Sequence, residues 1–434
     1  MTDQTGQTFS EKILSAKSGK PVVPGEIVDV TPDVAMSHDN TAAISRKFAT
    51  LGVRRVFDPD MHVIVLDHCA PAANEKFATN HKEIREFVEA QGIERFYDIN
   101  AGICHQILPE KGYALPGRLI VGSDSHTTTY GALGAFATGI GRAEMAVIMA
   151  TGKIWLRVPE TLKIEVTGRF PHGVTSKDLI LKIIGDLGAD GALYQAVEFS
   201  GPAVSRMSIS GRLTLCNMSV EMGAKNGYVE PDDKTLAYLN GRARGNFEIV
   251  RSDSDAHFVQ VVNYDVSDLE PQIARPHTVD DVAPAGEVAG TKIQQVVLGS
   301  CTNGRLEDLR AAASLLAGRK VANGTRLLVL PASQEIMREA MADGTLLTLL
   351  DAGAVLLNPN CGPCMGNHEG TLAPGEKALS SANRNFRGRM GCAEAEIYLG
   401  SPLSCAAAAV TGEICDVREW GDEGESHEAK SEGD

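Results

Sequence analysis

The stretch QQVVLGSCTN, residues 294–303, joins a short apolar run to a cysteine within a polar turn. A continuous apolar run of this length is typical of a strand buried in a parallel sheet. The same pattern occurs four more times, in MHVIVLDH (61–68), RLIVGSDSH (118–126), RLLVLPAS (326–333) and GAVLLNPNC (353–361). Two segments that lie between these runs, residues 81–92 and 333–344, have the pattern of helices that end at glycine. This alternation of strands and helices predicts an α/β fold.

Residues that can carry chemistry lie directly after these apolar runs. They are Asp67 and His68, then Asp124, Ser125 and His126, then Cys301, and finally Cys361 and Cys364. Open parallel sheets bind their ligands at the carboxyl ends of the strands. We therefore expect four strand ends to meet in one cleft.

The chain has 434 residues, of which 43% are hydrophobic, which is too long for one ordinary domain. Changes in composition predict domains at residues 1–160, 161–278 and 279–420. Residues 421–434 are acidic and polar, and we expect them to form a disordered tail.

The formal net charge is −15, which argues against nucleic acid as a partner. No apolar run reaches the length of a membrane span, and the first 20 residues do not resemble a secretory signal. The nine cysteines are spread along the chain rather than packed into a short disulfide scaffold. These features predict a cytoplasmic protein with no membrane partner.

The motif CGPC at 361–364 allows three interpretations. It is a redox disulfide, or part of a zinc site with Cys301 and His368, or part of an iron–sulfur site with Cys301. The spacing of these residues does not choose between zinc and iron–sulfur.

Seven blocks together resemble the aconitase superfamily, and within it the large subunits of 3-isopropylmalate dehydratase and homoaconitase. The blocks are LDH (66–68), GICHQILPE (102–110), VGSDSHTTTYGALGAFATGIG (121–141), CNMSVEMGAKNG (216–227), LGSCTNGR (298–305), NPNCGPCMG (358–366) and SANRNFRGRMG (381–391). They follow the family order over almost the whole chain.

The resemblance implies three aconitase-like α/β domains with an iron–sulfur cluster at their interface. It assigns one [4Fe–4S] cluster per chain to Cys301, Cys361 and Cys364, with the fourth iron open. It also implies a separate small subunit, the counterpart of the family's swivelling domain, which supplies a catalytic serine base.

The family removes water from a small hydroxy acid and adds it back at the neighbouring carbon. The resemblance implies three catalytic pairs: Asp67 with His68, His105 with Asp124, and His126 with Glu221. A carboxylate beside an imidazole raises the imidazole's pKa and fixes the orientation of the ring.

Substrate contacts are implied for Ser125, Asn217, Asn383, Arg384 and Arg389. The guanidinium groups of the two arginines suit a carboxylate through bidentate hydrogen bonding. Asn303 is similar to Ser125 and Asn217, and His38 lies where relatives place a polar contact, although its local match is loose.

The expected function is the large, cluster-bearing subunit of a hydro-lyase, first of all 3-isopropylmalate dehydratase of leucine biosynthesis. Homoaconitase and the dehydratases of citramalate or a dialkylmalate are alternatives with other substrates. Two further classes stay open, a zinc-bound structural protein and a cluster-free RNA-binding relative. A serine hydrolase is disfavoured because Asp124, Ser125 and His126 lack a Gly-x-Ser-x-Gly context.

Overall fold

The computed structural model describes residues 6–366 and 368–420, and the predicted α/β fold is confirmed. The first sheet has five parallel strands in the order β4-β3-β2-β5-β6. Their bounds are β2 (Val34–Ser37), β3 (His62–Val65), β4 (Phe96–Tyr97), β5 (Leu119–Gly122) and β6 (Phe136–Gly139). An antiparallel ribbon of β1 (Ile27–Val30) and β7 (Ile154–Arg157) accompanies it.

The second and third sheets lie further along the chain. The second is parallel, in the order β10-β9-β8-β11, with β8 (Thr161–Thr167), β9 (Ala196–Ser200), β10 (Asn226–Val229) and β11 (Gln260–Asp265). The third has seven strands in the order β13-β12-β18-β17-β14-β15-β16. They are β12 (Gln272–Ala274), β13 (Val282–Pro284), β14 (Gln295–Gly299), β15 (Arg326–Leu330), β16 (Val355–Leu356), β17 (Lys377–Ser380) and β18 (Glu396–Leu399).

Helices connect the strands. Those of the first 160 residues are α1 (Phe9–Ser18), α2 (Thr41–Thr50), α3 (Glu75–Gln91), α4 (Cys104–Glu110) and α5 (Arg142–Thr151). Next come α6 (Ser176–Leu187), α7 (Pro202–Arg206), α8 (Ile209–Met218) and α9 (Asp233–Leu239). The last are α10 (Ser300–Asn303), α11 (Leu306–Leu316), α12 (Gln334–Ala342), α13 (Thr345–Ala352) and α14 (Pro402–Thr411). Short 3₁₀ helices include η2 (Ser125–Leu133), η3 (Ser219–Met222) and η5 (Gly362–Met365).

The sequence explains the local structure of these elements. Every residue of β14, QVVLG, is buried, as a central parallel strand covered on both faces requires. On α3, His81, Ile84 and Val88 are buried at helical spacing, which gives this helix one apolar face. The helix ends at Gly92, whose φ of 70° is a left-handed conformation that favours glycine.

The functional residues lie at two places, one in the first sheet and one in the third, where the order of the strands reverses. The chain runs from β2 to β3 and β4 on one side, and β5 and β6 lie on the other side. In the third sheet, β15 and β16 lie on one side of β14, and β17 and β18 on the other. A crevice forms at the carboxyl ends of strands where the order reverses.

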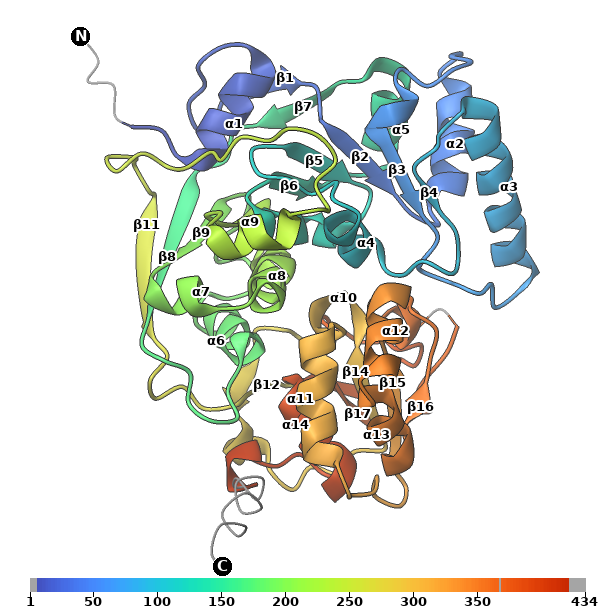
Figure 1. Cartoon of the computed structure of the whole chain (residues 1–434), viewed down its shortest axis with the longest axis vertical. Helices are drawn as coiled ribbons and strands as arrows, with labels where there is room; N and C mark the ends of the chain where they lie inside the picture. The colour runs from blue at the N-terminus through green and yellow to red at the C-terminus, as the bar shows by residue number, and fades with distance from the viewer. Residues whose placement is uncertain (1–5, 367, 421–434) are drawn as a thin grey trace, which may run out of the picture.

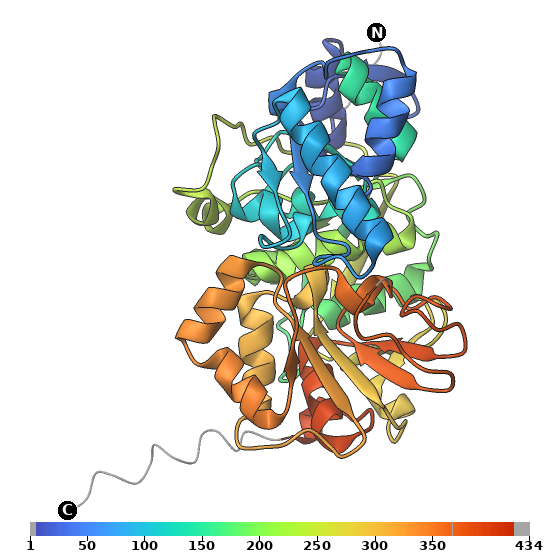
Figure 2. The same cartoon turned by 90° about the vertical axis from the view of Figure 1, so that its right-hand side faces the viewer.

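The first sheet lies above the third, and α4 and α10 face each other between them (Figure 1). Figure 2 shows the same stacking from the side, with residues 6–150 in blue to green at the top and residues 300–420 in orange and red below. A backbone hydrogen bond connects the segments that follow β3 and β16. The Cys361 N–H donates to the Asp67 carbonyl at 2.7 Å.

The domain boundaries at 160 and 278 stay a prediction. Each predicted domain contributes most of one sheet, but β12 joins the third sheet ahead of residue 278. The predicted acidic tail, 421–434, lies outside the described residues. Among the residues that are described, no helix combines the length and the apolar character needed to cross a membrane.

Candidate active site

Asp124 links three histidines at the end of β5. One of its carboxylate oxygens lies 2.8 Å from His105 Nε2 and accepts the His126 backbone N–H, also at 2.8 Å. Its other oxygen lies 3.5 Å from His68 Nε2. Burial raises the pKa of Asp124, but hydrogen bonds from its histidine partners outweigh burial and hold that pKa well below its usual range. Asp124 is therefore a fixed negative charge among three imidazoles.

Asp67 and His68 form a second carboxylate–imidazole pair at the end of β3. The ring Nδ1 of His68 lies 2.6 Å from Asp67 Oδ1, and the Cys104 backbone N–H donates to Asp67 Oδ2 at 2.7 Å. Burial lowers the pKa of His68, but Cys361 in its thiolate form and the Asp67 carboxylate outweigh burial, so the pKa lies well above its usual range. This environment favours the protonated form of His68.

Glu221 couples the third pair to the last part of the chain. His126 Nε2 lies 2.8 Å from Glu221 Oε1, and Arg384 Nε donates to the same carboxylate at 2.8 and 3.1 Å. Burial raises the pKa of Glu221, but His126 and Arg384 outweigh burial and keep that pKa below its usual value. The structure thus brings together all three pairs that the sequence suggested, although their catalytic roles stay predictions.

The three cysteines of the predicted cluster are buried free thiols, each no more than 8% exposed. Polar donors face two of them. Asn217 Nδ2 donates to Cys301 Sγ at 3.3 Å, and Arg389 Nη2 donates to Cys364 Sγ at 3.5 Å. Burial raises the pKa of Cys301 to about 12 and that of Cys361 to about 11, so each thiol needs a metal or another positive charge to stay deprotonated.

The zinc interpretation does not fit this arrangement. Tetrahedral zinc with Zn–S bonds of about 2.3 Å places its ligand atoms roughly 3.8 Å apart. Across residues 6–366 and 368–420, the groups of three or more ligand atoms within 4.8 Å of one another contain no cysteine. His368 Nε2 instead lies 3.0 Å from Glu369. Three cysteines spaced more widely suit a larger metal group.

The two predicted asparagines connect the cysteines. Asn383 Nδ2 donates to Asn217 Oδ1 at 3.3 Å and to Cys301 Sγ at 3.5 Å, and its own Oδ1 lies 3.6 Å from Cys364 Sγ. Ser125 begins η2, next to Asp124. Asn303 differs from this group, because its amide donates to Asp308 at 3.0 Å and supports the loop itself.

The comparisons with known proteins identify the family of this chain. The sequence profile of the aconitase family (aconitate hydratase) matches residues 11–290 and 282–412. The chain belongs to the aconitase family. Membership in the aconitase family implies an iron–sulfur cluster, and the buried cysteines with their amide and guanidinium donors fit such a group.

Relatives within the aconitase family extend over nearly the whole chain. The chain is 53% identical over 416 residues to 3-isopropylmalate dehydratase large subunit 1 of Methanopyrus kandleri, covering 96% of this chain and 100% of that one. It is 51% identical to large subunit 1 of Pyrococcus furiosus, with coverages of 95% and 99%. It is also 53% identical to a probable methanogen homoaconitase large subunit of Methanosarcina mazei, with coverages of 89% and 98%.

A solved structure, holo aconitase X of Thermococcus kodakaraensis, matches with a TM-score of 0.49 and 12% identity. It covers 88% of this chain and 93% of that chain. A likeness this distant carries no argument about the site.

Sequence reasoning missed Asp39, which holds the Asp67–His68 segment in place. One carboxylate oxygen accepts the backbone N–H groups of Asp67 and His68 at 2.9 and 2.8 Å. The other accepts the Cys69 N–H at 3.2 Å and lies 2.8 Å from His81 Nε2 on α3. Burial raises the pKa of Asp39, but hydrogen bonds, with that from His81 first, lower it far more. The position of Asp39 after β2 was its only signal in the sequence.

We predict that Asp39→Asn lowers kcat roughly 30-fold, because a displacement of about 1 Å in a catalytic group can cost a hundredfold. An amide nitrogen cannot accept these N–H groups, so we also expect a loss of about 3 kcal/mol in the free energy of unfolding. Because the pKa of Asp39 is lower in the folded state, its stabilisation exists at neutral pH and is lost as the pH falls.

The control for this variant is Asp60→Asn, which changes an exposed aspartate of the same region. The measurements are kcat, KM, iron content and thermal unfolding, with Asp39→Glu as the conservative variant. A kcat for Asp39→Asn within threefold of the control would show that Asp39 does not position the pair.

Three further buried residues support the site. His38 stacks on His68 with ring centroids 3.7 Å apart, and burial lowers the pKa of His38 to about 4, so it is neutral. Lys177 on α6 donates to the carbonyls of Ser381 and Ala382, at 2.7 and 2.5 Å, directly before Asn383. Arg305 donates to the carbonyls of Cys301 and Thr302, both at 2.7 Å. The sequence gives no sign of these links, because the partners lie on different elements.

Proposed function

We propose that the chain is the large, cluster-bearing subunit of a hydro-lyase that isomerises a hydroxy acid by dehydration and rehydration. The proposed enzyme is 3-isopropylmalate dehydratase. The observation that carries the proposal is the convergence of three carboxylate–imidazole pairs on a group of buried cysteines. The names of the relatives at about 50% identity supply the substrate.

The cofactor is proposed to be one [4Fe–4S] cluster on Cys301, Cys361 and Cys364. A four-iron cubane with three thiolate ligands leaves one iron without a protein ligand. When bound, such a cluster supplies a Lewis acid for the substrate hydroxyl. Asn217, Asn383 and Arg389 would stabilise the sulfur charge, since each already donates to a cysteine sulfur.

The protein's own residues manage protons and substrate carboxylates. His68 is held protonated beside Asp67 and Asp124, so it can protonate a departing hydroxide. His105 and His126 share the Asp124 carboxylate and extend this network along the cleft. Arg384 and Arg389 face the same site, and we propose that a substrate carboxylate competes for their guanidinium groups with Glu221 and Cys364.

The base that removes the carbon-bound proton is proposed to come from a separate small subunit. The relatives are named large subunits, and the chain spans 99% to 100% of the length of three of them. His68, held protonated beside Asp67, is a poor base, and we assign this task to a partner. We further propose that the complex is cytoplasmic and acts in leucine biosynthesis.

A substrate panel tests the proposed substrate. The cluster-loaded chain, combined with its small subunit under anaerobic conditions, is assayed with 3-isopropylmalate, homocitrate, citramalate and a dialkylmalate. We expect the highest kcat/KM with 3-isopropylmalate. Homocitrate is the second candidate, because homoaconitase large subunits match at 53% and 49% identity. A preference for homocitrate would replace the proposed substrate and leave the reaction class unchanged.

A further inference from the structure

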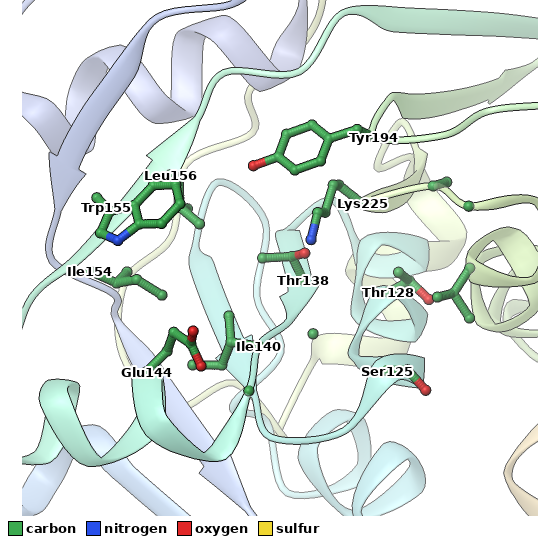
Figure 3. Close-up of a pocket in the computed structure, with 15 residues that line it drawn as sticks. Ser125, Thr128, Thr138, Ile140, Glu144, Ile154, Trp155, Leu156, Tyr194 and Lys225 are labelled. Atoms are coloured by element: carbon green, nitrogen blue, oxygen red, sulfur yellow. The ribbon is translucent and has the colours of Figure 1, made fainter. Parts of the chain in front are cut away.

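A cavity of about 470 Å³ lies behind the turn that carries the Asp124 carboxylate. This volume is within the range of small-molecule sites. Ser125 and Thr128 line part of it, but the Thr128 hydroxyl donates to the Asn217 carbonyl, and the Ser125 oxygen is directed away from Lys225 and Thr138 (Figure 3). The cavity is therefore separate from the cleft that contains the three pairs.

Two hydrogen-bond donors face this cavity without a partner in the described part of the chain. Thr138 Oγ1 is buried, with 2% of the residue exposed, and makes no hydrogen bond. The partly buried Lys225 has neither an ion pair nor a hydrogen bond there, and it lines the same cavity as Thr138 (Figure 3). A buried polar group without a partner costs about 1–3 kcal/mol, so the Thr138 hydroxyl indicates a hydrogen-bonding group on a ligand.

The opposite wall carries a negative charge. Glu144, an exposed residue in the first turn of α5, faces Lys225 across the cavity (Figure 3) and forms no ion pair among the described residues. The N-cap residue Gly141 has no side chain to accept from that turn. A cation and an anion on opposite walls, neither in a salt bridge with a described residue, match a ligand with two opposite charges.

The remaining wall of the cavity is apolar, and one residue beside it has a strained backbone. Ile140, Ile154 and Leu156 line the space between the two charges. Tyr194 closes one side with a φ of 61°, an uncommon conformation for a bulky residue. The Arg157 guanidinium lies 4.1 Å from the Tyr194 ring centroid, and the Lys225 ammonium lies 4.8 Å from it. This arrangement leaves room for an aliphatic group.

We propose that the cavity binds an α-amino acid with an aliphatic side chain. Its carboxylate accepts from Lys225 and Thr138, its ammonium donates to Glu144, and its side chain packs on Ile140, Ile154 and Leu156. The site touches the catalytic turn from behind, because a Cβ at Gly139 would lie 2.8 Å from the Asp124 carbonyl. Binding there does not depend on which hydroxy acid the enzyme uses.

The test is calorimetric titration of the full, cluster-loaded chain with three probes of similar shape. L-leucine has both charges, 4-methylpentanoate has only the carboxylate, and 3-methylbutylamine has only the ammonium. We expect L-leucine to bind at one site per chain, at least tenfold more tightly than either other probe, which equals about 1.4 kcal/mol. It should also raise the Tm of the chain, because a ligand stabilises the state that binds it.

The variants Lys225→Met, Thr138→Val and Glu144→Gln should each weaken L-leucine binding about tenfold. Lys76→Met, on α3 away from the cavity, is the matched control, and thermal unfolding checks that each variant folds. Absence of L-leucine binding at millimolar concentration would overturn the proposal. So would equal binding of 4-methylpentanoate, or unchanged binding in the folded Lys225→Met and Thr138→Val variants.

Discussion

Replacing Cys361 with Ser should abolish both the iron–sulfur cluster and the dehydratase activity. A serine hydroxyl is a much poorer ligand than a thiolate for iron. Cys361 also bonds through its backbone to Asp67, so it lies where the metal site meets the catalytic pairs. We expect activity to fall by at least about a thousandfold, since a metal Lewis acid and its template contribute several kcal/mol to the barrier.

The measurement for this variant is iron content together with the visible spectrum after anaerobic purification. Wild-type chain should be brown and contain about four irons, as a cubane requires. Cys415→Ser is the matched control, because this half-buried cysteine lies near the Thr411 hydroxyl, away from the other cysteines. A Cys361→Ser chain that keeps four irons and half of its activity would contradict the ligand assignment.

Asp124→Asn should lower kcat about a thousandfold, the scale at which positioned acid–base groups contribute. The variant keeps the shape of the side chain but removes the charge that His68, His105 and His126 share. A neutral neighbour no longer favours the imidazolium form of His68, so this ring loses its proton at lower pH. The fall in activity on the alkaline side should therefore move to lower pH.

The pH profile separates this role from a structural one. Loss of folding alone would lower activity at every pH, whereas loss of the charge shifts the profile. Asp60→Asn again serves as the control, since that residue is exposed. An unchanged profile, or a kcat within threefold of wild type, would show that Asp124 is not the centre of the network.

The sequence predicted the fold because parallel strands leave a simple signal. Runs such as QVVLG of β14 are apolar throughout, and the residues directly after each strand must lie at the carboxyl edge of the sheet. That reasoning places Cys301, Asp67 and Asp124 near one cleft. The same reasoning located the strand in GAVLLNPNC (353–361) less accurately, because only two residues of that segment form β16.

The rest of the site depends on contacts between distant segments. Glu221 and Arg384 are 163 positions apart, and only the packing of the sheets brings them to 2.8 Å. Asp39 accepts hydrogen bonds from backbone N–H groups. Such contacts do not depend on the side chain of the partner residue, so the sequence does not reveal them. Lys177 is a lysine on a helix, which usually indicates a solvated face, yet it is fully buried.

The most direct test of the account is turnover of 3-isopropylmalate by the anaerobically reconstituted chain, measured with and without its small subunit over a range of concentrations. The described cleft has a protonated imidazole and anionic carboxylates, and we assign the base to the partner. The account predicts a cluster-loaded chain with negligible activity alone and full turnover when the small subunit is added. Equal rates with and without the small subunit would place the base in this chain and contradict the assigned roles.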